Sequence, residues 1–508
     1  MPPPVLVYRG EAVTASHFEQ RWRRSAAALA ALGVGDGDVV ALMLHNRPEA
    51  IELMLAIRHL GAQWCPVNWH YKADEVRHIL HDSGARVFVV EAALLQELLG
   101  SSLEVLPATV RVFTCGQADP ARAQAPGPAA PWEAERDRAE PLAAPAAPLR
   151  GAMFYTSGTT GRPKGIVRAA ATPQQLQRGI EVRRLSYGLA RAPGDERVLL
   201  SAPLYHSAPN AYALSAVLEG ATVYLEERFE AERTLALIDQ HRLTHAYLVP
   251  TMFVRLLALP ATVRAKYNLG SMRFVASTGS PCPPQVKREM IEWWGPVIHE
   301  SYGASELGYM TLLTPEQALR KPGSAGAPLP GVTLAILDEQ GRELPRGQAG
   351  LIYIDQPAFA DFSYANNAQA RERMAVGPLK TMGDVGFIDD DGFLFIVDRQ
   401  ADMVISGGVN IYPVEIEAVL HTMPGVADCA VFGVPDDEFG ESLAAAVQPA
   451  PGTGLTPEAV RAYLHQRLAG FKVPKVVTLH EALPREDTGK IFKRILREPY
   501  WAGRSRRV

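Results

Sequence analysis

Apolar positions in the N-terminal part of the chain follow two different periods. One set recurs at helical spacing and predicts a helix with a single buried stripe, at Phe18, Trp22, Ala26 and Leu29. The unbroken apolar run Val39-Val-Ala-Leu-Met-Leu44 is instead typical of a strand buried on both faces, as in a parallel sheet. A helix is predicted to begin at Pro48, because proline suits the first helical position. A second strand is predicted over residues 86–90. This alternation predicts an α/β fold in which helices cover mostly parallel sheets.

The C-terminal part of the chain has the pattern of a separate small unit. A helix is predicted to begin at Pro413, and the apolar run over residues 428–434 predicts a strand. Thr456-Pro457 is a good helix start, since threonine caps the N-terminus and proline takes the first helical position. We therefore expect a large N-terminal domain over residues 1–400 and a small α+β domain over residues 401–508.

A stretch over residues 117–148 is rich in alanine and proline and poor in large apolar residues. Such a composition cannot bury enough apolar surface to offset the entropy cost of ordering. We expect an exposed loop or linker there. A domain boundary and a long surface excursion are both compatible with it.

Length, charge and cysteine content narrow the class of protein. A chain of 508 residues is too long for one hydrophobic core, so two or more domains are expected. The formal net charge of −4 gives no basis for nucleic-acid binding. The four cysteines stand far apart without a CxxC pair, which disfavours a zinc site and fits a reducing cytosol. No signal peptide or integral membrane segment is evident, so we expect a soluble cytoplasmic protein and leave a homodimer open.

The strongest chemical signal is the segment Tyr155-Thr-Ser-Gly-Thr-Thr-Gly-Arg-Pro-Lys-Gly165. Glycine lets a backbone approach a ligand closely, and successive N–H groups and hydroxyls can then surround phosphate oxygens, with Lys164 adding positive charge. A solvated loop of turn-forming residues is the plain alternative. A Walker A loop is disfavoured, because that motif needs Gly-Lys-Ser/Thr and here Pro163 precedes the lysine.

This segment resembles the phosphate-binding loop of the adenylate-forming superfamily, which contains acyl- and aryl-CoA synthetases, luciferase-like enzymes and peptide-synthetase adenylation domains. Further segments resemble motifs of that family in the expected order, namely Tyr302-Gly-Ala-Ser-Glu306, Gly383-Asp384, Asp398-Arg399, Ser406-Gly-Gly-Val-Asn-Ile-Tyr-Pro413 and Pro484-Arg-Glu-Asp-Thr-Gly-Lys490. The resemblance extends over nearly the whole chain from Val39 onward. It implies that the small C-terminal domain is mobile.

The resemblance implies a set of residues around the phosphates of ATP. The phosphates would lie against the glycine-rich loop, formed by Thr156, Ser157, Gly158, Thr159, Thr160, Gly161 and Lys164. Glu306 would hold Mg²⁺, a hard cation that prefers oxygen ligands. Ser305, where the family usually has threonine, would hydrogen-bond the α-phosphate. Lys490 would bridge the substrate carboxylate and the α-phosphate in the transition state, offsetting the repulsion between them.

The same resemblance implies residues around the nucleoside. Tyr302 would stack on the adenine beside Gly303 and Ala304, with the turn formed by Gly279, Ser280 and Pro281 along the adenine edge. Asp384 would accept hydrogen bonds from the ribose hydroxyls, and Arg399 would donate to the same sugar. Taken singly, Asp384 and Arg399 could form an ordinary surface ion pair and Lys490 could be solvated, since charged side chains are usually exposed. The ordered set of motifs favours the functional roles.

His206 matches a family position between the acyl pocket and the phosphates, and a structural histidine in a loop is an equal alternative. Small residues follow it and would leave room for an acyl group or serve tight helix packing, namely Ala208, Asn210, Ala211 and Ala213.

Coenzyme A is expected to meet the C-terminal domain. By resemblance, a loop formed by Ser406, Gly407 and Gly408 would line a tunnel for the thiol, and Lys472 lies in a segment near the same surface. Basic residues of the tail could bind its phosphates or simply be solvated, namely Lys493, Arg494, Arg497, Arg504, Arg506 and Arg507. Ala401 departs from the family's Asp or Lys at the hinge, so we expect altered domain alternation with intact adenylation chemistry. The segment over residues 361–367 also departs from the family pattern, and nothing is inferred from it.

The expected function is an AMP-forming acyl-CoA ligase that uses ATP, Mg²⁺ and coenzyme A, most similar to bacterial fatty-acyl-CoA synthetases. An aryl-CoA ligase for a benzoate- or cinnamate-like acid is the first alternative. Adenylation for a carrier protein without CoA is the second. An adenylate-binding module without turnover is the alternative from a different class. Retention of Lys164, Glu306, Asp384 and Lys490 speaks against that last alternative, because binding alone would not require Lys490.

Overall fold

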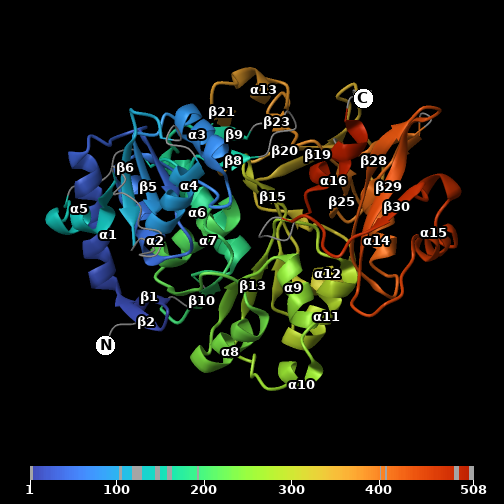
Figure 1. Cartoon of the computed structure of the whole chain (residues 1–508), viewed down its shortest axis with the longest axis horizontal. Coiled ribbons are helices and arrows are strands. Elements are labelled where there is room, and N and C mark those ends of the chain that lie inside the picture. The colour runs from blue at the N-terminus through green and yellow to red at the C-terminus, as the bar shows by residue number, and fades with distance from the viewer. Residues whose placement is uncertain are drawn as a thin grey trace.

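The computed structural model describes residues 4–101, 106–116, 129–143, 149–156, 163–190, 194–400, 402–406, 409–485 and 491–502. It is an α/β protein with two parallel sheets in its larger N-terminal part and a smaller C-terminal part at the opposite end of the long axis from the first helix (Figure 1). No helix among these residues is both long and apolar enough to cross a membrane.

The predicted strand at Val39 lies inside a five-stranded parallel sheet with the order β4-β3-β5-β6-β7. Its strands are β3 (Val39–Met43), β4 (Gln63–Pro66), β5 (Val87–Glu91), β6 (Arg111–Cys115) and β7 (Ala130–Pro131). Every residue of β3 is buried, as the unbroken apolar run predicted. Helix α2 (Pro48–His59) begins at the predicted proline, and α3 (Ala73–Asp82) and α4 (Ala92–Ser101) follow the next strands. Helix α1 (Ala15–Ala31) buries three residues of the predicted stripe and leaves Trp22 half-buried.

A second sheet of seven strands has the order β14-β13-β12-β10-β11-β1-β2, and its neighbouring strands are parallel except in the N-terminal hairpin. Its strands are β1 (Pro4–Tyr8), β2 (Glu11–Thr14), β10 (Arg197–Leu200), β11 (Thr222–Leu225), β12 (His245–Tyr247), β13 (Phe274–Ser277) and β14 (Ile298–Glu300). The helices that accompany it include α6 (Pro173–Tyr187), α7 (Ser207–Leu218), α8 (Ala231–His241), α9 (Pro250–Leu257) and α11 (Pro284–Trp294).

The carboxyl ends of the two parallel sheets meet. Asn46 follows β3, and its side-chain amide donates to the carbonyl of Ala202 after β10 (2.9 Å) and to that of Glu226 after β11 (3.0 Å). One hydrophobic core runs through both sheets. Ligands of open α/β sheets bind outside the carboxyl ends of the strands, so this junction is where a site is expected.

Antiparallel strands carry two of the predicted motifs. Strands β24 (Asp384–Ile388) and β25 (Leu394–Arg399) belong to a six-stranded sheet and set Asp384 opposite Arg399. The glycine-rich loop connects β8 (Tyr155–Thr156) to β9 (Lys164–Arg168), which pair antiparallel with Thr156 opposite Lys164. Strand β21 (Phe362–Tyr364) pairs with the other edge of β9.

The C-terminal part has its own five-stranded sheet and its own hydrophobic core. Its strands are β26 (Val404–Ser406), β27 (Val409–Ile411), β28 (Val426–Asp436), β29 (Gly440–Pro449) and β30 (Val476–Leu479). Helices α14 (Pro413–Leu420) and α15 (Pro457–His465) begin where predicted, and Thr456 caps α15 by accepting from the Ala459 amide (3.2 Å). Helix α16 (Lys493–Trp501) packs on β28 near the C-terminus (Figure 1).

The prediction of an exposed loop or linker over residues 117–148 is wrong for part of that stretch. Residues 130–138 form β7 and helix α5 (Trp132–Arg138), while residues 117–128 and 144–148 lie outside the described residues. Trp132 is fully buried and lies edge-on against Phe113, with 5.6 Å between ring centroids. One large aromatic ring anchors a segment whose average composition is that of a linker, because it buries more apolar area than several alanines.

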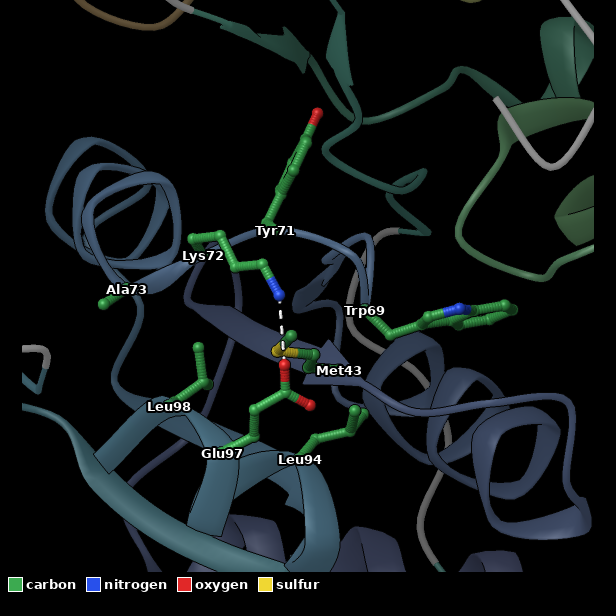
Figure 2. A pocket seen from close by; sticks show the side chains of 8 residues that line it. All are labelled: Met43, Trp69, Tyr71, Lys72, Ala73, Leu94, Glu97 and Leu98. Atoms are coloured by element: carbon green, nitrogen blue, oxygen red, sulfur yellow. Dashed lines mark hydrogen bonds and ion pairs between the residues drawn. The ribbon is translucent and has the colours of Figure 1, made fainter. Parts of the chain in front are cut away.

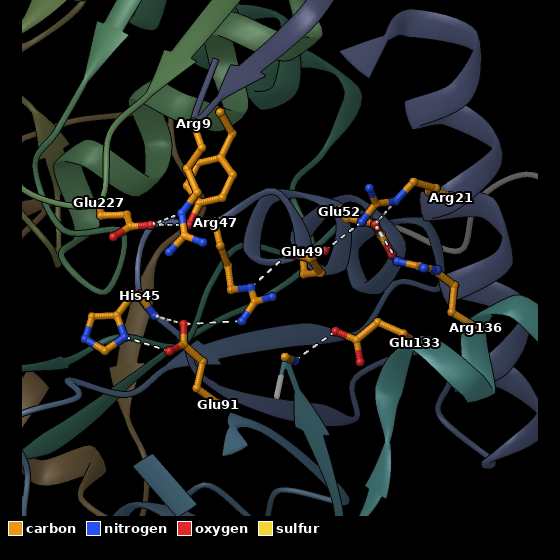
Figure 3. A network of polar contacts seen from close by, with 12 residues as sticks. Arg9, Arg21, His45, Arg47, Glu49, Glu52, Glu91, Glu133, Arg136 and Glu227 are labelled. Atoms are coloured by element: carbon orange, nitrogen blue, oxygen red, sulfur yellow. Dashed lines mark hydrogen bonds and ion pairs between the residues drawn. The ribbon is translucent and has the colours of Figure 1, made fainter. Parts of the chain in front are cut away.

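A buried ionic network ties α5 to the first two helices (Figure 3). The Glu52 carboxylate is fully buried and receives hydrogen bonds from Arg21 (2.8 Å), Ser25 (2.5 Å) and Arg136 (3.4 Å). Burial raises the pKa of Glu52, and the two guanidinium groups act against that shift. The network fixes these helices beside the first parallel sheet, away from the predicted site residues.

Candidate functional site

The centre of the predicted site is a short hairpin that follows β14. Strands β15 (Gly303–Ala304) and β16 (Gly308–Tyr309) pair antiparallel, so Tyr302, Ser305 and Glu306 stand on or beside one tight turn. The turn depends on two glycines. A Cβ on Gly303 would come within 2.8 Å of the Gly308 carbonyl oxygen, and Gly308 has a φ of +74°.

Tyr302, Asp384 and Arg399 form one hydrogen-bonded set. The Tyr302 hydroxyl donates to Oδ2 of Asp384 (2.5 Å) and Nε of Arg399 donates to Oδ1 (3.1 Å). The Asp384 side chain is only 8 % exposed, so it is a buried carboxylate, and it pairs with Arg399, whose side chain is 56 % exposed. Burial, reinforced by Asp384, raises the pKa of Tyr302 and keeps its hydroxyl protonated as a donor. A carboxylate oxygen has two acceptor positions, so Asp384 can accept from a further hydroxyl donor.

Glu306 lies beside the hairpin that carries the glycine-rich loop. Its Oε1 accepts from the Thr156 hydroxyl (3.3 Å) and from the Tyr364 hydroxyl (3.1 Å), and Glu306 is buried. Nζ of Lys164 lies 5.6 Å from the centroid of the Tyr364 ring. A buried carboxylate with a neighbouring hydroxyl is a donor set of hard oxygens, which fits Mg²⁺ that also keeps waters and phosphate oxygens as ligands.

Two residues of this site were missed in the sequence. Tyr364 lies in the segment from which nothing was inferred. The alternation of Phe362 and Tyr364 is typical of a strand and was the signal that could have placed Tyr364 in the sheet. Pairing of β21 with β9 brings Tyr364 to Glu306. Arg168 ends β9, and its guanidinium donates to the carbonyls of Ala360 (2.7 Å), Ser305 (2.9 Å) and Glu306 (2.5 Å). Burial lowers the pKa of Arg168. No local pattern distinguishes this arginine from an exposed one.

The N-terminus of α7 meets the hairpin through two hydroxyls. Ser207, the first residue of α7, has its Oγ 2.8 Å from Oγ of Ser305. His206 is the residue preceding the helix, and its ring lies against Tyr205 with 4.3 Å between centroids. His206 is thus brought next to the hairpin segment, and its chemical role stays a prediction.

The contacts of Asn210 favour the packing alternative over room for an acyl group. Asn210 is buried, accepts from Nε1 of Trp64 (3.1 Å) and donates to the Leu204 carbonyl (2.8 Å). Its amide serves to hold the loop in front of α7. Ala208 and Ala211 are half-buried, and Ala213 is buried.

The other predicted site residues lie near this hairpin or outside the described residues. The turn at Gly279 follows β13 at its carboxyl end, with a φ of +98° at the glycine, and Ser280 and Pro281 continue it. The predicted residues outside the described part of the chain are Ser157, Gly158, Thr159, Thr160, Gly161, Ala401, Gly407, Gly408, Lys490, Arg504, Arg506 and Arg507. Their proposed roles stay predictions.

The predicted CoA-binding residues of the C-terminal part have different surroundings. Ser406 ends β26 opposite Val409. Lys472, in a short 3₁₀ turn, has its Nζ 2.7 Å from both carboxylate oxygens of Glu415, so its charge is already paired. Lys493 is the first residue of α16, and its Nζ pairs with Glu417 (2.8 Å). The prediction that Lys493 is simply solvated is therefore wrong, and its contact with CoA phosphates stays a prediction. Nearby acidic groups raise the pKa of Lys493 against the opposite effect of burial.

A pocket of about 140 Å³ opens at the carboxyl end of β3 (Figure 2). Lys72 and Glu97 face one another across it with 3.0 Å between Nζ and Oε1. Trp69 forms one wall and lies edge-on to Tyr205 with 4.5 Å between centroids. None of the predicted site residues lines this pocket.

The comparisons with known proteins agree on one family. The profile of the family described as AMP-binding enzyme matches residues 3–361, and that of the AMP-binding enzyme C-terminal domain matches residues 415–490. A fatty acid–[acyl-carrier-protein] ligase, ScoC, from Streptomyces coeruleorubidus is 33% identical, with 99% of this chain and 95% of the relative covered. A feruloyl-CoA synthase from an Amycolatopsis species is 34% identical over 95% and 93%, and a long-chain-fatty-acid–CoA ligase from Mycobacterium tuberculosis is 34% identical over 94% and 91%.

Solved structures with a similar fold also bind ATP. ATP-bound MatB from Rhodopseudomonas palustris is similar with a TM-score of 0.85 and 28% identity, covering 98% of this chain and 96% of that one. The o-succinylbenzoate coenzyme A synthetase of Bacillus subtilis in complex with ATP and magnesium ion is similar with a TM-score of 0.81 and 27% identity, covering 98% and 97%.

Proposed function

The chain belongs to the AMP-binding enzyme family of adenylate-forming ligases, and from this premise we propose that it joins a hydrophobic carboxylic acid to the thiol of coenzyme A. It is an AMP-forming acid–thiol ligase by family, with ATP and Mg²⁺ as nucleotide and metal and CoA as co-substrate. The acid and the roles of single residues are the proposal.

One observation carries the proposal. The hairpin from Tyr302 to Glu306 contacts three of the segments that the proposed reaction uses. Tyr302 reaches Asp384, Glu306 reaches Thr156 beside the glycine-rich loop, and Ser305 reaches Ser207 at the start of α7. A nucleotide whose ribose lies at Asp384 and whose phosphates lie at Thr156 would therefore cross the hairpin. Its α-phosphate would lie near Ser305.

In the first step, a carboxylate oxygen of the acid attacks the α-phosphorus of ATP, and the bond to pyrophosphate breaks. Both reactants are anions, so the residues must supply positive charge and fixed donors. Lys164 and Lys490 supply the charge, and the Ser305 hydroxyl donates to the α-phosphate. Mg²⁺ held by Glu306 would neutralise phosphate charge. Asp384 and Tyr302 hold the nucleoside so that the attack is in line.

In the second step, the CoA sulfur attacks the acyl carbonyl of the acyl-adenylate, and AMP leaves with the electron pair of the broken C–O bond. For this step we place the domain boundary between residues 400 and 401. Residues 1–400 hold the adenylate, and residues 401–508 move so that Ser406, Gly407 and Gly408 line the path of the thiol. Phe471 is 55% exposed, and an exposed aromatic ring suits stacking against the adenine of coenzyme A.

The acid is proposed to be a fatty or another hydrophobic acid. The support is that relatives at about the same identity are named for fatty, feruloyl and indoleacetate substrates, all of which have an apolar body. A carrier-protein thiol is the second candidate acceptor, because the relative that is 33% identical over 99% of this chain is an acyl-carrier-protein ligase. The buried free cysteines fit the reducing cytoplasm as the location of the protein. Size-exclusion chromatography with light scattering would test whether it forms a homodimer.

The test is AMP release from MgATP with a panel of fatty and aromatic acids, each without acceptor, with CoA and with a phosphopantetheinylated carrier protein. CoA-dependent AMP release with one acid class is expected. Stimulation by the carrier alone would replace CoA as the acceptor. A Glu306→Gln variant is expected to lose most of the AMP release, and Glu372→Gln, an exposed carboxylate on the helix after β21, is the matched control. ATP binding without AMP from any acid would refute the ligase.

A further inference from the structure

Two backbone segments that meet at Ser305 are each held by buried polar contacts. On one side, Asn46 accepts from the Leu204 amide (2.9 Å) and donates to the Ala202 carbonyl, and Asn210 donates to the Leu204 carbonyl (2.8 Å). On the other side, Arg168 binds the Ser305 carbonyl. The backbones before α7 and at the hairpin are therefore fixed independently of each other.

With both backbones fixed, the freedom that remains at Ser305 is the rotation of its side chain. Serine has no branch at Cβ, so three rotamers compete, whereas threonine is restricted because it carries two heavy atoms there. Ser305 carries no second heavy atom on Cβ. This chain therefore lacks the methyl group that would limit the direction of the hydroxyl.

Ser207 supplies a restriction of another kind. Its Oγ lies 2.8 Å from Oγ of Ser305, and both side chains are half-buried. A hydroxyl has one hydrogen to donate and can accept two. If Ser305 donates its hydrogen to an anionic phosphate oxygen, the hydrogen between the two serines must come from Ser207. Ser207 would then fix the rotamer of Ser305 and polarise its O–H bond toward the phosphate.

We propose that Ser207 is a positioning residue for adenylation, which orients the Ser305 hydroxyl toward the α-phosphate in place of the methyl group of a threonine. The proposal rests on the function proposed above, because it needs a nucleotide phosphate next to Ser305. It makes the effect of Ser207 conditional on which residue stands at position 305.

The experiment is a double-mutant cycle on the full chain with Ser207→Ala, Ser305→Thr and the double variant. The readouts are the Kd for MgATP by calorimetry and the kcat for AMP release with the preferred acid. Ser207→Ala is expected to weaken MgATP binding and to lower kcat by about two- to tenfold, the range of one hydrogen bond. In the Ser305→Thr background the same substitution is expected to cost less than twofold, because the methyl group now restricts the rotamer. Ser207→Thr keeps the hydroxyl and should restore both values.

Ser215→Ala is the matched control, since Ser215 is a buried serine of the same helix. An equal loss from Ser207→Ala in both backgrounds would reduce Ser207 to a structural residue and overturn the proposal. Unchanged Kd and kcat in Ser207→Ala would overturn it as well. A failure of the proposed ligase function would give a different result. The wild-type protein would then release no AMP with any acid, while the Kd for MgATP would still show the coupling of positions 207 and 305.

Discussion

Arg168 is the residue whose replacement most directly tests how the hairpin is held. Its guanidinium binds three backbone carbonyls from two segments, those of Ala360, Ser305 and Glu306. We consider two substitutions. Arg168→Lys keeps the charge and loses the planar fork that reaches several acceptors at once. Arg168→Met keeps the apolar stem and removes the charge.

The magnitude follows from the contacts. A hydrogen bond from a charged donor contributes about 1.5–3 kcal/mol, and three bonds to one group do not add fully. Burial opposes the charged form, as the lowered pKa of Arg168 indicates, so part of this gain is offset. For Arg168→Lys we expect a loss of about 2–4 kcal/mol in the free energy of unfolding, because a buried charge keeps only part of its hydrogen bonds. Arg168→Met should lose less stability, because no charge stays buried.

The assay pairs urea unfolding with MgATP affinity. If Arg168 positions the hairpin, both variants lose MgATP affinity by at least tenfold, although Arg168→Met is the more stable of the two. Arg178→Lys, an exposed arginine of α6, is the matched control and should leave both quantities unchanged. Wild-type MgATP affinity in Arg168→Met would refute the positioning role. Wild-type stability in Arg168→Lys would refute the magnitude derived from the three bonds.

Three further predictions follow from single contacts. Trp132→Ala should lower the free energy of unfolding by about 3–5 kcal/mol, because the ring is fully buried. An effect below about 1 kcal/mol in urea unfolding would show that Trp132 does not anchor this segment. Tyr364→Phe should weaken Mg²⁺-dependent ATP binding several-fold by releasing Glu306 from one donor, while metal-free ATP binding stays the same; equal losses with and without Mg²⁺ would contradict this. Burial raises the pKa of Asp398 from 3.8 to about 6, so the folded state keeps a proton that the unfolded state has lost between these values. The free energy of unfolding should therefore fall by about 2 kcal/mol as the pH rises from 4 to 6. Urea unfolding of Asp398→Asn across that range should lack this decrease, and parallel curves for both proteins would exclude Asp398 as its source.

The sequence was sufficient for local structure wherever a local cause dominates. Proline and threonine at helix starts predicted α2, α14 and α15, and the apolar run at Val39 predicted a fully buried strand. The alanine- and proline-rich stretch was misread because composition averages over many residues. A single ring at Trp132 decides whether part of it is ordered.

The same distinction between local and long-range causes applies to the candidate site. The order of motifs in the sequence was enough to determine the family and to nominate Tyr302, Glu306 and Asp384, because each stands in a recognisable local pattern. Only the tertiary structure brought Tyr364 to Glu306 and the Arg168 guanidinium to the hairpin carbonyls. Such contacts join strands far apart in the chain. The local sequence around an arginine or tyrosine in a strand does not show whether its side chain faces water or a buried carboxylate. Sequence therefore determined which residue types were present, and strand pairing decided which of them meet.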